Sequence, residues 1–127
     1  MDYILDTHVL LWSMFESSKL SQSAREILVD RKSRRFISIS SMWEIAIKNR
    51  IGKLQLPCSI DDIFSTVEKR GYGLLGINQR HIEIYNTLPL LHRDPFDGII
   101  IASAILQKMT IITTDENIQK YDVLWTC

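Results

Sequence analysis

The chain has 127 residues, with 15 basic and 15 acidic side chains, so its formal net charge is zero. This balance argues against a protein that holds nucleic acid through a global excess of positive charge, although it allows a local basic patch. The length fits one domain, residues 1–127, with its own hydrophobic core. Apolar residues make up 46% and charged residues 24% of the chain, which excludes a disordered or fibrous protein.

The two cysteines, Cys58 and Cys127, lie far apart, and neither belongs to a CxxC pair or a Cys/His cluster. This spacing excludes a zinc ribbon and a disulfide scaffold. The amino terminus has no basic segment, and the longest strongly apolar stretch, residues 99–106, is far shorter than the roughly 20 residues that span a bilayer. We therefore expect a reduced, cytoplasmic protein with no membrane segment.

Apolar runs and helical periodicities alternate along the chain. The pattern predicts strands over residues 3–5, 36–39, 74–77, 110–113 and 123–125. It predicts helices over residues 9–15, 21–30, 42–51, 60–67, 80–88 and 96–109, with Ser21 and the pair Ser40-Ser41 as caps. Strands that are apolar on both faces and alternate with helices are typical of a parallel sheet covered on two sides. We therefore predict an α/β fold, a three-layer α/β/α sandwich with a parallel sheet of four to five strands.

Acidic residues from distant parts of the chain follow the expected strands or begin the next helices: Asp6, Glu44, Asp94, Asp97 and Asp115. The carboxyl ends of parallel strands meet at one edge of the sheet, so these carboxylates could gather in one site. Such a cluster needs a neutralising cation, and ligands that are all oxygen favour Mg²⁺ or Mn²⁺ over zinc. A divalent ion held in this way suits hydrolysis of a phosphodiester by activated water.

Each acid also has a purely structural interpretation. Asp6, Asp94 and Asp115 stand where they could cap the helices that follow them. Glu44 could pair with Lys48 four residues later on a helix surface. The common placement of the acids, rather than any one of them, carries the prediction of a site.

The histidines and aromatic residues near these acids are given structural interpretations. His8, His81 and His92 are scattered along the chain, and a lone histidine is more often a satisfied polar group than a catalyst. The aromatic residues beside the acids occur at helical spacing, which favours core packing over base stacking; they are Trp12, Trp43 and Phe96.

Four ordered segments, residues 5–12, 41–54, 92–97 and 113–115, resemble the PIN-domain ribonucleases, and most closely the VapC-type toxins of bacterial type II toxin–antitoxin pairs. The resemblance covers essentially the whole chain. It implies an α/β/α sandwich and a Mg²⁺- or Mn²⁺-dependent endoribonuclease. It also implies a homodimer and a cognate antitoxin protein that blocks the active site.

The resemblance assigns roles to individual residues. It implies catalytic and metal-binding roles for Asp6, Glu44, Asp97 and Asp115, an additional acidic position for Asp94, and supporting hydroxyls at Thr7 and Thr113. Similar toxins often carry Arg after the last Asp of the third segment, where this chain has Gly98. Basic residues that could face RNA are Lys48, Arg50 and Lys53, or Arg31, Lys32, Arg34 and Arg35, although the latter group could equally be a solvated helix end.

Three other functions are alternatives, and the residues argue against the first two. A receiver-type phosphoacceptor domain has a similar length, but it needs an acidic pair after the first strand and an acid after the third, where this chain has Asn78. A haloacid-dehalogenase-like phosphatase needs an Asp where His8 stands. A catalytically inert binding module with the same fold is the third alternative.

Overall fold

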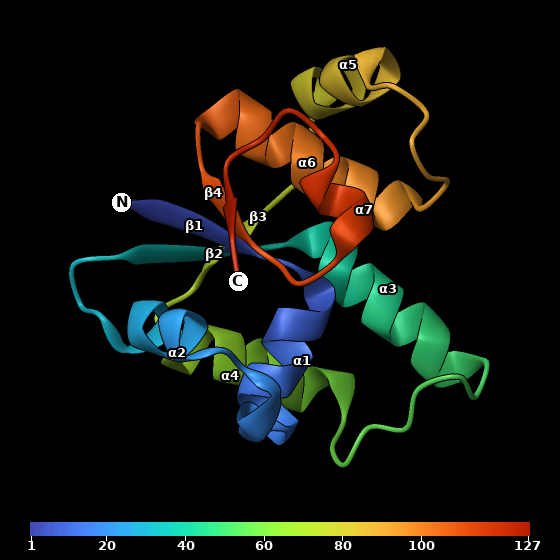
Figure 1. The fold of residues 1–127 in the computed structure, drawn as a ribbon. Coiled ribbons are helices and arrows are strands. Elements are labelled where there is room, and N and C mark those ends of the chain that lie inside the picture. The colour runs from blue at the N-terminus through green and yellow to red at the C-terminus, as the bar shows by residue number, and fades with distance from the viewer.

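Five strands form one parallel sheet in the computed structural model, which describes residues 1–127. The strands are β1 (Asp2–Leu5), β2 (Arg34–Ser38), β3 (Gly73–Leu75), β4 (Thr110–Ile112) and β5 (Trp125–Thr126). Their order across the sheet is β3-β2-β1-β4-β5 (Figure 1). A receiver domain, which is flavodoxin-like, has the order 2-1-3-4-5. The sheet order therefore excludes the receiver alternative.

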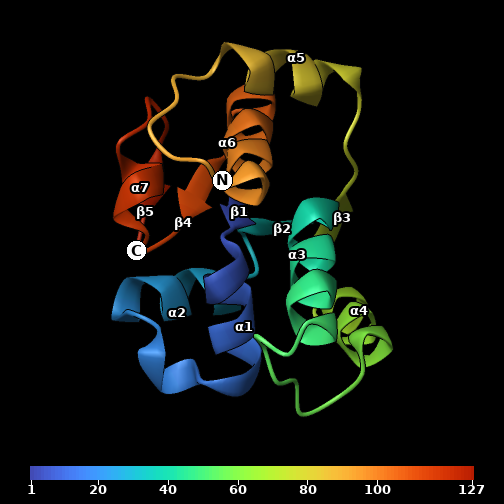
Figure 2. The same cartoon turned by 90° about the vertical axis from the view of Figure 1, so that its right-hand side faces the viewer.

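Helices cover both faces of the sheet. They are α1 (Thr7–Phe15), α2 (Gln22–Val29), α3 (Ile39–Arg50), α4 (Ile60–Lys69), α5 (Gln79–Thr87), α6 (Pro95–Gln107) and α7 (Glu116–Gln119), with a 3₁₀ turn at Ser17–Lys19. Helices α1, α2 and α4 lie on one side of the sheet, and α5, α6 and α7 lie on the other (Figures 1 and 2). The predicted three-layer α/β/α sandwich is confirmed.

The alternation of side chains along each strand divides the core in two. In β1, Ile4 faces the α6 side, whereas Leu5 packs with helices α1 to α4 on the other side. In β4, Ile111 and Ile112 divide in the same way. All four side chains are fully buried, as expected for central strands that are covered on both faces.

The second predicted strand and helix meet at a different residue from the one expected. Strand β2 ends at Ser38, whose hydroxyl accepts a hydrogen bond from the Ser40 backbone N–H at 3.1 Å and caps α3. The prediction that Ser40-Ser41 caps the helix was wrong, because both serines lie buried inside its first turn. Strand β3 is also shorter than the predicted 74–77, and β5 begins at Trp125 rather than at residue 123.

Sheet topology selects one edge for a functional site. The chain moves outward from β1 through β2 to β3, and then returns to the other side of β1 as β4. In open α/β sheets, ligands bind beyond the carboxyl ends of the strands where the order reverses in this way. That position is the edge where β1 continues into Asp6 and β4 continues into Thr113.

None of the helices is long and apolar enough to cross a membrane. Both cysteines are free thiols, with Cys58 half-buried against the α1–α4 core and Cys127 exposed.

Candidate active site

Asp6 lies at the carboxyl end of β1 and is almost completely buried, with a relative exposure of 2%. Its Oδ1 accepts the backbone N–H of His8 at 3.3 Å, which caps α1, and its Oδ2 accepts the Thr113 hydroxyl at 2.8 Å. The predicted capping role and a role in the site are therefore combined in one side chain. Burial raises the pKa of Asp6, and the hydrogen bond from Thr113 acts against that rise.

Glu44 lies in the second turn of α3 and is also buried. Thr7 Oγ1 donates to Glu44 Oε1 at 2.9 Å and also hydrogen-bonds Ser41 Oγ at 2.8 Å. Lys48 Nζ lies 2.6 Å from Glu44 Oε2. The predicted pair between residues 44 and 48 therefore exists. It is not a surface contact, because the Glu44 side chain is only 4% exposed.

Asp94 and Asp97 begin helix α6. Asp94 Oδ1 accepts the backbone N–H groups of Phe96 and Asp97 at 2.9 and 3.2 Å, with Pro95 at the first helical position. The N-cap predicted for Asp94 is thus present. Asp97, one turn further into the helix, is buried, and its carboxylate accepts no hydrogen bond from the protein.

Asp115 completes the acidic edge. It caps the short helix α7 through the Asn117 backbone N–H at 2.8 Å, and its own N–H donates to Thr113 Oγ1 at 3.0 Å. Thr113 is fully buried, and its hydroxyl links the two acids because it donates to Asp6 and accepts from the backbone of Asp115. The structure thus holds the acid that follows β1 and the acid that follows β4 on the same hydroxyl group.

The electrostatics of Asp97 show that these acids form one cluster. Burial raises the pKa of Asp97 to about 9, and the charges of other acids contribute to the shift: Asp6, Asp94, Asp115 and Glu44. The other four predicted acids therefore lie close enough to Asp97 to act on it at the same sheet edge. Such an arrangement is costly without a cation, and this cost is typical of functional sites.

Residues 3–124 match the family described as PIN domain. The chain belongs to the PIN-domain family. No curated protein sequence is significantly similar to it.

Solved structures similar to this PIN domain come from bacterial protein pairs. One is VapBC2 from Rickettsia felis bound to a DNA fragment from its promoter, with a TM-score of 0.75 and 14% identity, covering 99% of this chain and 98% of that chain. A second is VapBC-1 from nontypeable Haemophilus influenzae, with a TM-score of 0.67 and 22% identity, covering 99% and 97%. A third is FitAcB from Neisseria gonorrhoeae, with a TM-score of 0.67 and 15% identity, covering 98% and 96%. At these identities the likeness concerns the fold.

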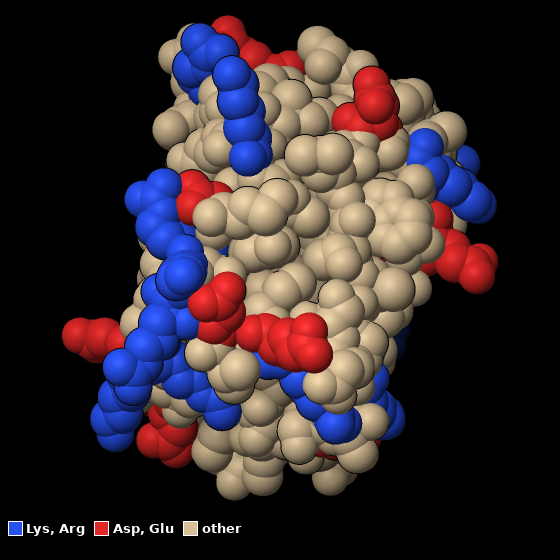
Figure 3. Space-filling model, turned by 60° about the vertical axis from the view of Figure 1, so that its left-hand side comes forward, with Lys and Arg blue, Asp and Glu red and all other residues tan.

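The predicted basic residues of this PIN domain lie in two separate places, at the end of α3 and at the start of β2. Lys48 lies in the acidic site, and Arg50 and Lys53 are exposed at the end of α3. Arg34 and Arg35 lie at the amino end of β2, opposite to the carboxyl ends of the strands where the acids lie. In the view of Figure 3, Lys and Arg side chains follow the left edge of the molecule, with Asp and Glu side chains among them.

Both arginines of β2 already have partners in the protein. Arg34 forms two hydrogen bonds to the Asp2 carboxylate, at 2.8 and 2.6 Å. Arg35 donates to the backbone carbonyls of Ile27 and Asp30, at 3.3 and 2.8 Å. The structure therefore does not bring these two arginines to the acids.

Two aromatic residues beside the acids differ in their burial. Trp12 is half-buried against the α1–α4 core, as predicted. Trp43 is 61% exposed, so its predicted place in the core was wrong. Its ring meets the half-buried Phe96 edge to face, with 5.5 Å between centroids. The residue that follows Trp43 in α3, Glu44, is the buried one.

Sequence reasoning missed two members of the site. Ser41 is fully buried and hydrogen-bonded to Thr7, but it was predicted to cap the helix. His92 was interpreted as structural, yet its Nε2 lies 4.0 Å from Asp97 Oδ2. The only signal in the sequence was their position beside the acidic segments. His8 is exposed and His81 is buried away from the acids, where it caps α5 together with Asn78.

Gly98 has a steric explanation. A Cβ atom at this position would overlap the ring of Tyr85, which packs from α5 against the start of α6. A side chain at residue 98 therefore requires Tyr85 to move. Beside this contact lies a cavity of about 320 Å³ whose lining includes His92 and Asp94.

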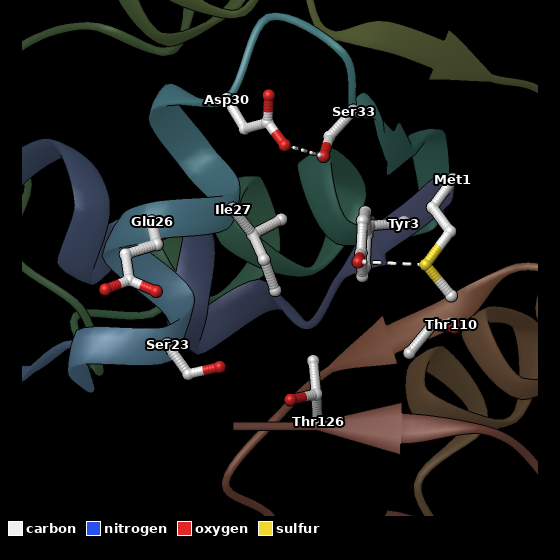
Figure 4. Close-up of a pocket in the computed structure, with 9 residues that line it drawn as sticks. All are labelled: Met1, Tyr3, Ser23, Glu26, Ile27, Asp30, Ser33, Thr110 and Thr126. Carbon is white, nitrogen blue, oxygen red and sulfur yellow. Dashed lines mark hydrogen bonds between the residues drawn. The ribbon is translucent and has the colours of Figure 1, made fainter.

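A larger cavity, of about 460 Å³, lies elsewhere (Figure 4). It is lined by residues at the amino ends of the strands, such as Met1, Ser33 and Thr110, and by Glu26 and Ile27 of α2. Its lining includes none of the five clustered acids. This cavity is therefore distinct from the acidic edge.

The Thr113 hydroxyl should contribute measurably to stability. Thr113→Val keeps the shape of the side chain but leaves Asp6 Oδ2 and the Asp115 N–H without their partner. We expect a loss of about 1–2 kcal/mol in the free energy of unfolding, measured by urea denaturation. Thr114→Val, at the exposed neighbouring position, is the matched control. Equal stability of the two variants would contradict this role of Thr113.

Proposed function

We propose that this PIN domain is a metal-dependent endoribonuclease that hydrolyses RNA phosphodiester bonds and acts as the toxin of a type II toxin–antitoxin pair. The observation that carries the proposal is the gathering of five carboxylates at one edge of the sheet, where burial, together with the charges of the other acids, raises the pKa of Asp97 to about 9. A site that disfavours its own ionisation in the absence of a cation is well suited to bind one.

The donor set fits a hard divalent ion. Asp6, Asp97 and Asp115, with Glu44, offer only carboxylate oxygens, which suit Mg²⁺ or Mn²⁺. As they stand, no three His, Cys, Asp or Glu side chains of the chain are arranged to hold a metal ion. Metal binding therefore requires the carboxylate groups to move closer together. A bound divalent ion supplies charge stabilisation at the phosphate and lowers the pKa of the attacking water.

The surrounding residues hold the acids ready for this role. Thr113 orients Asp6, and Thr7 orients Glu44. Lys48 balances the charge of Glu44, and its side chain is 40% exposed, so its ammonium group can also reach an RNA phosphate at the mouth of the site. None of these side chains is placed as a covalent nucleophile, so water is the proposed nucleophile.

The proposed partners are a cognate antitoxin and a second copy of the chain, in the cytoplasm. The solved structures with the same fold include VapBC pairs, which supports an antitoxin partner. The exposed ring of Trp43, next to Glu44 on α3, offers an apolar surface beside the acidic site that a protein partner could cover.

RNA cleavage with defined metals tests the function. We expect cleavage with Mn²⁺ or Mg²⁺, none after chelation with EDTA, and products with 5′-phosphate and 3′-hydroxyl ends. Asp6→Asn should abolish both cleavage and growth inhibition while the protein still folds. Asp122→Asn, an exposed acid outside the cluster, should leave both unchanged.

Two outcomes would count against the proposal. Products that end in a 2′,3′-cyclic phosphate would contradict hydrolysis by water. A wild-type protein that binds no Mn²⁺ and cuts no RNA would instead favour the inert binding module.

A further inference from the structure

One buried nitrogen of the PIN domain faces the acidic site without a hydrogen-bond partner. Only three buried side-chain polar atoms in the chain are unpaired: Arg35 Nε, His81 Nε2 and His92 Nε2. The His92 side chain is 11% exposed, so its nitrogen is largely shielded from solvent. A buried unpaired donor is costly, and such groups call for an explanation.

The contacts of the His92 ring determine which nitrogen carries the proton. His92 Nδ1 accepts the backbone N–H of Asp94 at 3.2 Å, so the neutral ring carries its hydrogen on Nε2. The ring packs against Tyr121, with 5.3 Å between centroids, which limits its movement. The Nε2 atom of this ring lies 4.0 Å from Asp97 Oδ2.

Asp97 is the matching unpaired acceptor. Asp6, Asp94, Asp115 and Glu44 each accept at least one hydrogen bond through the side chain. No donor of the protein reaches the Asp97 carboxylate, although this side chain is only 9% exposed. An unpaired donor and an unpaired acceptor thus lie 4.0 Å apart, about one ångström more than a hydrogen bond.

We propose that His92 is a positioning residue, which donates its Nε2–H to Oδ2 of ionised Asp97 and leaves the other carboxylate oxygen directed at a divalent metal. This inference rests on the proposed metal-dependent function. A small rotation of the Asp97 side chain closes the gap, and an ionised carboxylate accepts stronger hydrogen bonds than a neutral one. Groups that orient metal ligands in this way change metal affinity about 10- to 100-fold when they are removed.

His81 provides a matched control within the same chain. Its Nδ1 also accepts a backbone N–H, from Asn78 at 3.1 Å, and its Nε2 is also buried and unpaired. His81 forms no pair with any acid. Its replacement should therefore affect stability alone, which separates a structural histidine from a positioning one.

Calorimetric titration with Mn²⁺ at constant pH tests the proposal without any RNA. We expect His92→Phe, which keeps a ring against Tyr121 but has no donor, to weaken Mn²⁺ binding about 10- to 100-fold. His92→Gln, which keeps an N–H donor at a similar reach, should stay within about threefold of wild type. His81→Phe should bind Mn²⁺ as wild type does. Circular dichroism establishes that each variant is folded, and His92→Met serves as the donor-free variant if the phenylalanine does not fit.

A direct signal comes from the His92 Nε2–H resonance in the proton NMR spectrum, with diamagnetic Mg²⁺ as the ion. It should shift downfield and exchange more slowly when Mg²⁺ is added, whereas the His81 resonance should not move. Wild-type Mn²⁺ affinity in His92→Phe, or an equal loss in His81→Phe, would overturn the positioning role and leave the proposed function intact. A wild-type protein that binds no Mn²⁺ would overturn both proposals.

Discussion

Asp97→Asn should stabilise the metal-free protein at pH 7 while it abolishes RNA cleavage. The buried carboxyl has a pKa of about 9, because burial and four other acids disfavour its charge. Asparagine has a similar shape and carries no charge at any pH. The substitution therefore removes the unfavourable contribution to folding that comes from burying this carboxyl group among the other acids of the proposed site.

The pH dependence of this effect has a definite sign. In the unfolded chain an Asp has a pKa of about 3.9, so between about pH 4 and pH 9 the folded state holds a proton that the unfolded state has lost. The stability of the metal-free wild type should then fall as the pH rises through this range. The Asp97→Asn variant lacks this titrating group, so this fall of stability with pH should be absent. Its free energy of unfolding at pH 7 should exceed that of the wild type by an amount on the order of 2–4 kcal/mol.

Urea denaturation in EDTA at pH 5, 7 and 9 measures the effect, with Asp61→Asn on the exposed surface of α4 as the control. The gain from Asp97→Asn should increase from pH 5 to pH 9. Added Mn²⁺ should stabilise the wild type more than the variant, because ligand binding to the folded state adds to stability. A variant that is less stable than wild type at pH 7, or a gain that does not change with pH, would refute the assignment.

The arrangement of the acids could be predicted from the sequence because it depends on strand ends. Each central strand is a short apolar run, and a polar residue marks where it stops, as Asp6 does after β1 and Thr113 after β4. Parallel pairing then brings these ends together without any knowledge of side-chain contacts. The order of the strands across the sheet was not predicted, because it depends on tertiary packing.

The orientation of individual side chains could not be predicted in the same way. Hydrophobic periodicity predicts that Trp43 is buried and Glu44 is exposed. In the structure Trp43 is exposed and Glu44 is buried. The position of His92 depends on a loop hydrogen bond to Asp94, and the fit of Gly98 depends on a ring from another helix. Local pattern rules fail where a site holds polar groups in the interior at a cost to stability.

Lys48→Met should destabilise the protein by about 1–3 kcal/mol, because it leaves a buried charge without its partner. Glu44 is 4% exposed, and its Oε2 depends on the Lys48 ammonium at 2.6 Å. The hydrogen bond to Glu44 also raises the pKa of Lys48, so the contact favours the charged form of the lysine. The methionine keeps the length of the apolar stem, so the change isolates the charge.

A double-mutant cycle separates the pair from its surroundings. Glu44→Gln should remove most of the cost of Lys48→Met, since no unpaired charge then remains in the interior. The control is the exposed pair Lys19–Glu16, whose side chains are 53% and 55% exposed, and where Lys19→Met should change stability by less than about 0.5 kcal/mol. Two results would show that Lys48 is not the counter-ion of the acidic site. One is a loss in the free energy of unfolding from Lys48→Met no larger than the loss from Lys19→Met, and the other is an unchanged loss from Lys48→Met when Glu44→Gln is also present. Relief by Glu44→Gln together with tighter Mn²⁺ binding in Lys48→Met would show that the lysine and the metal compete for the same carboxylate, because both cations neutralise Glu44.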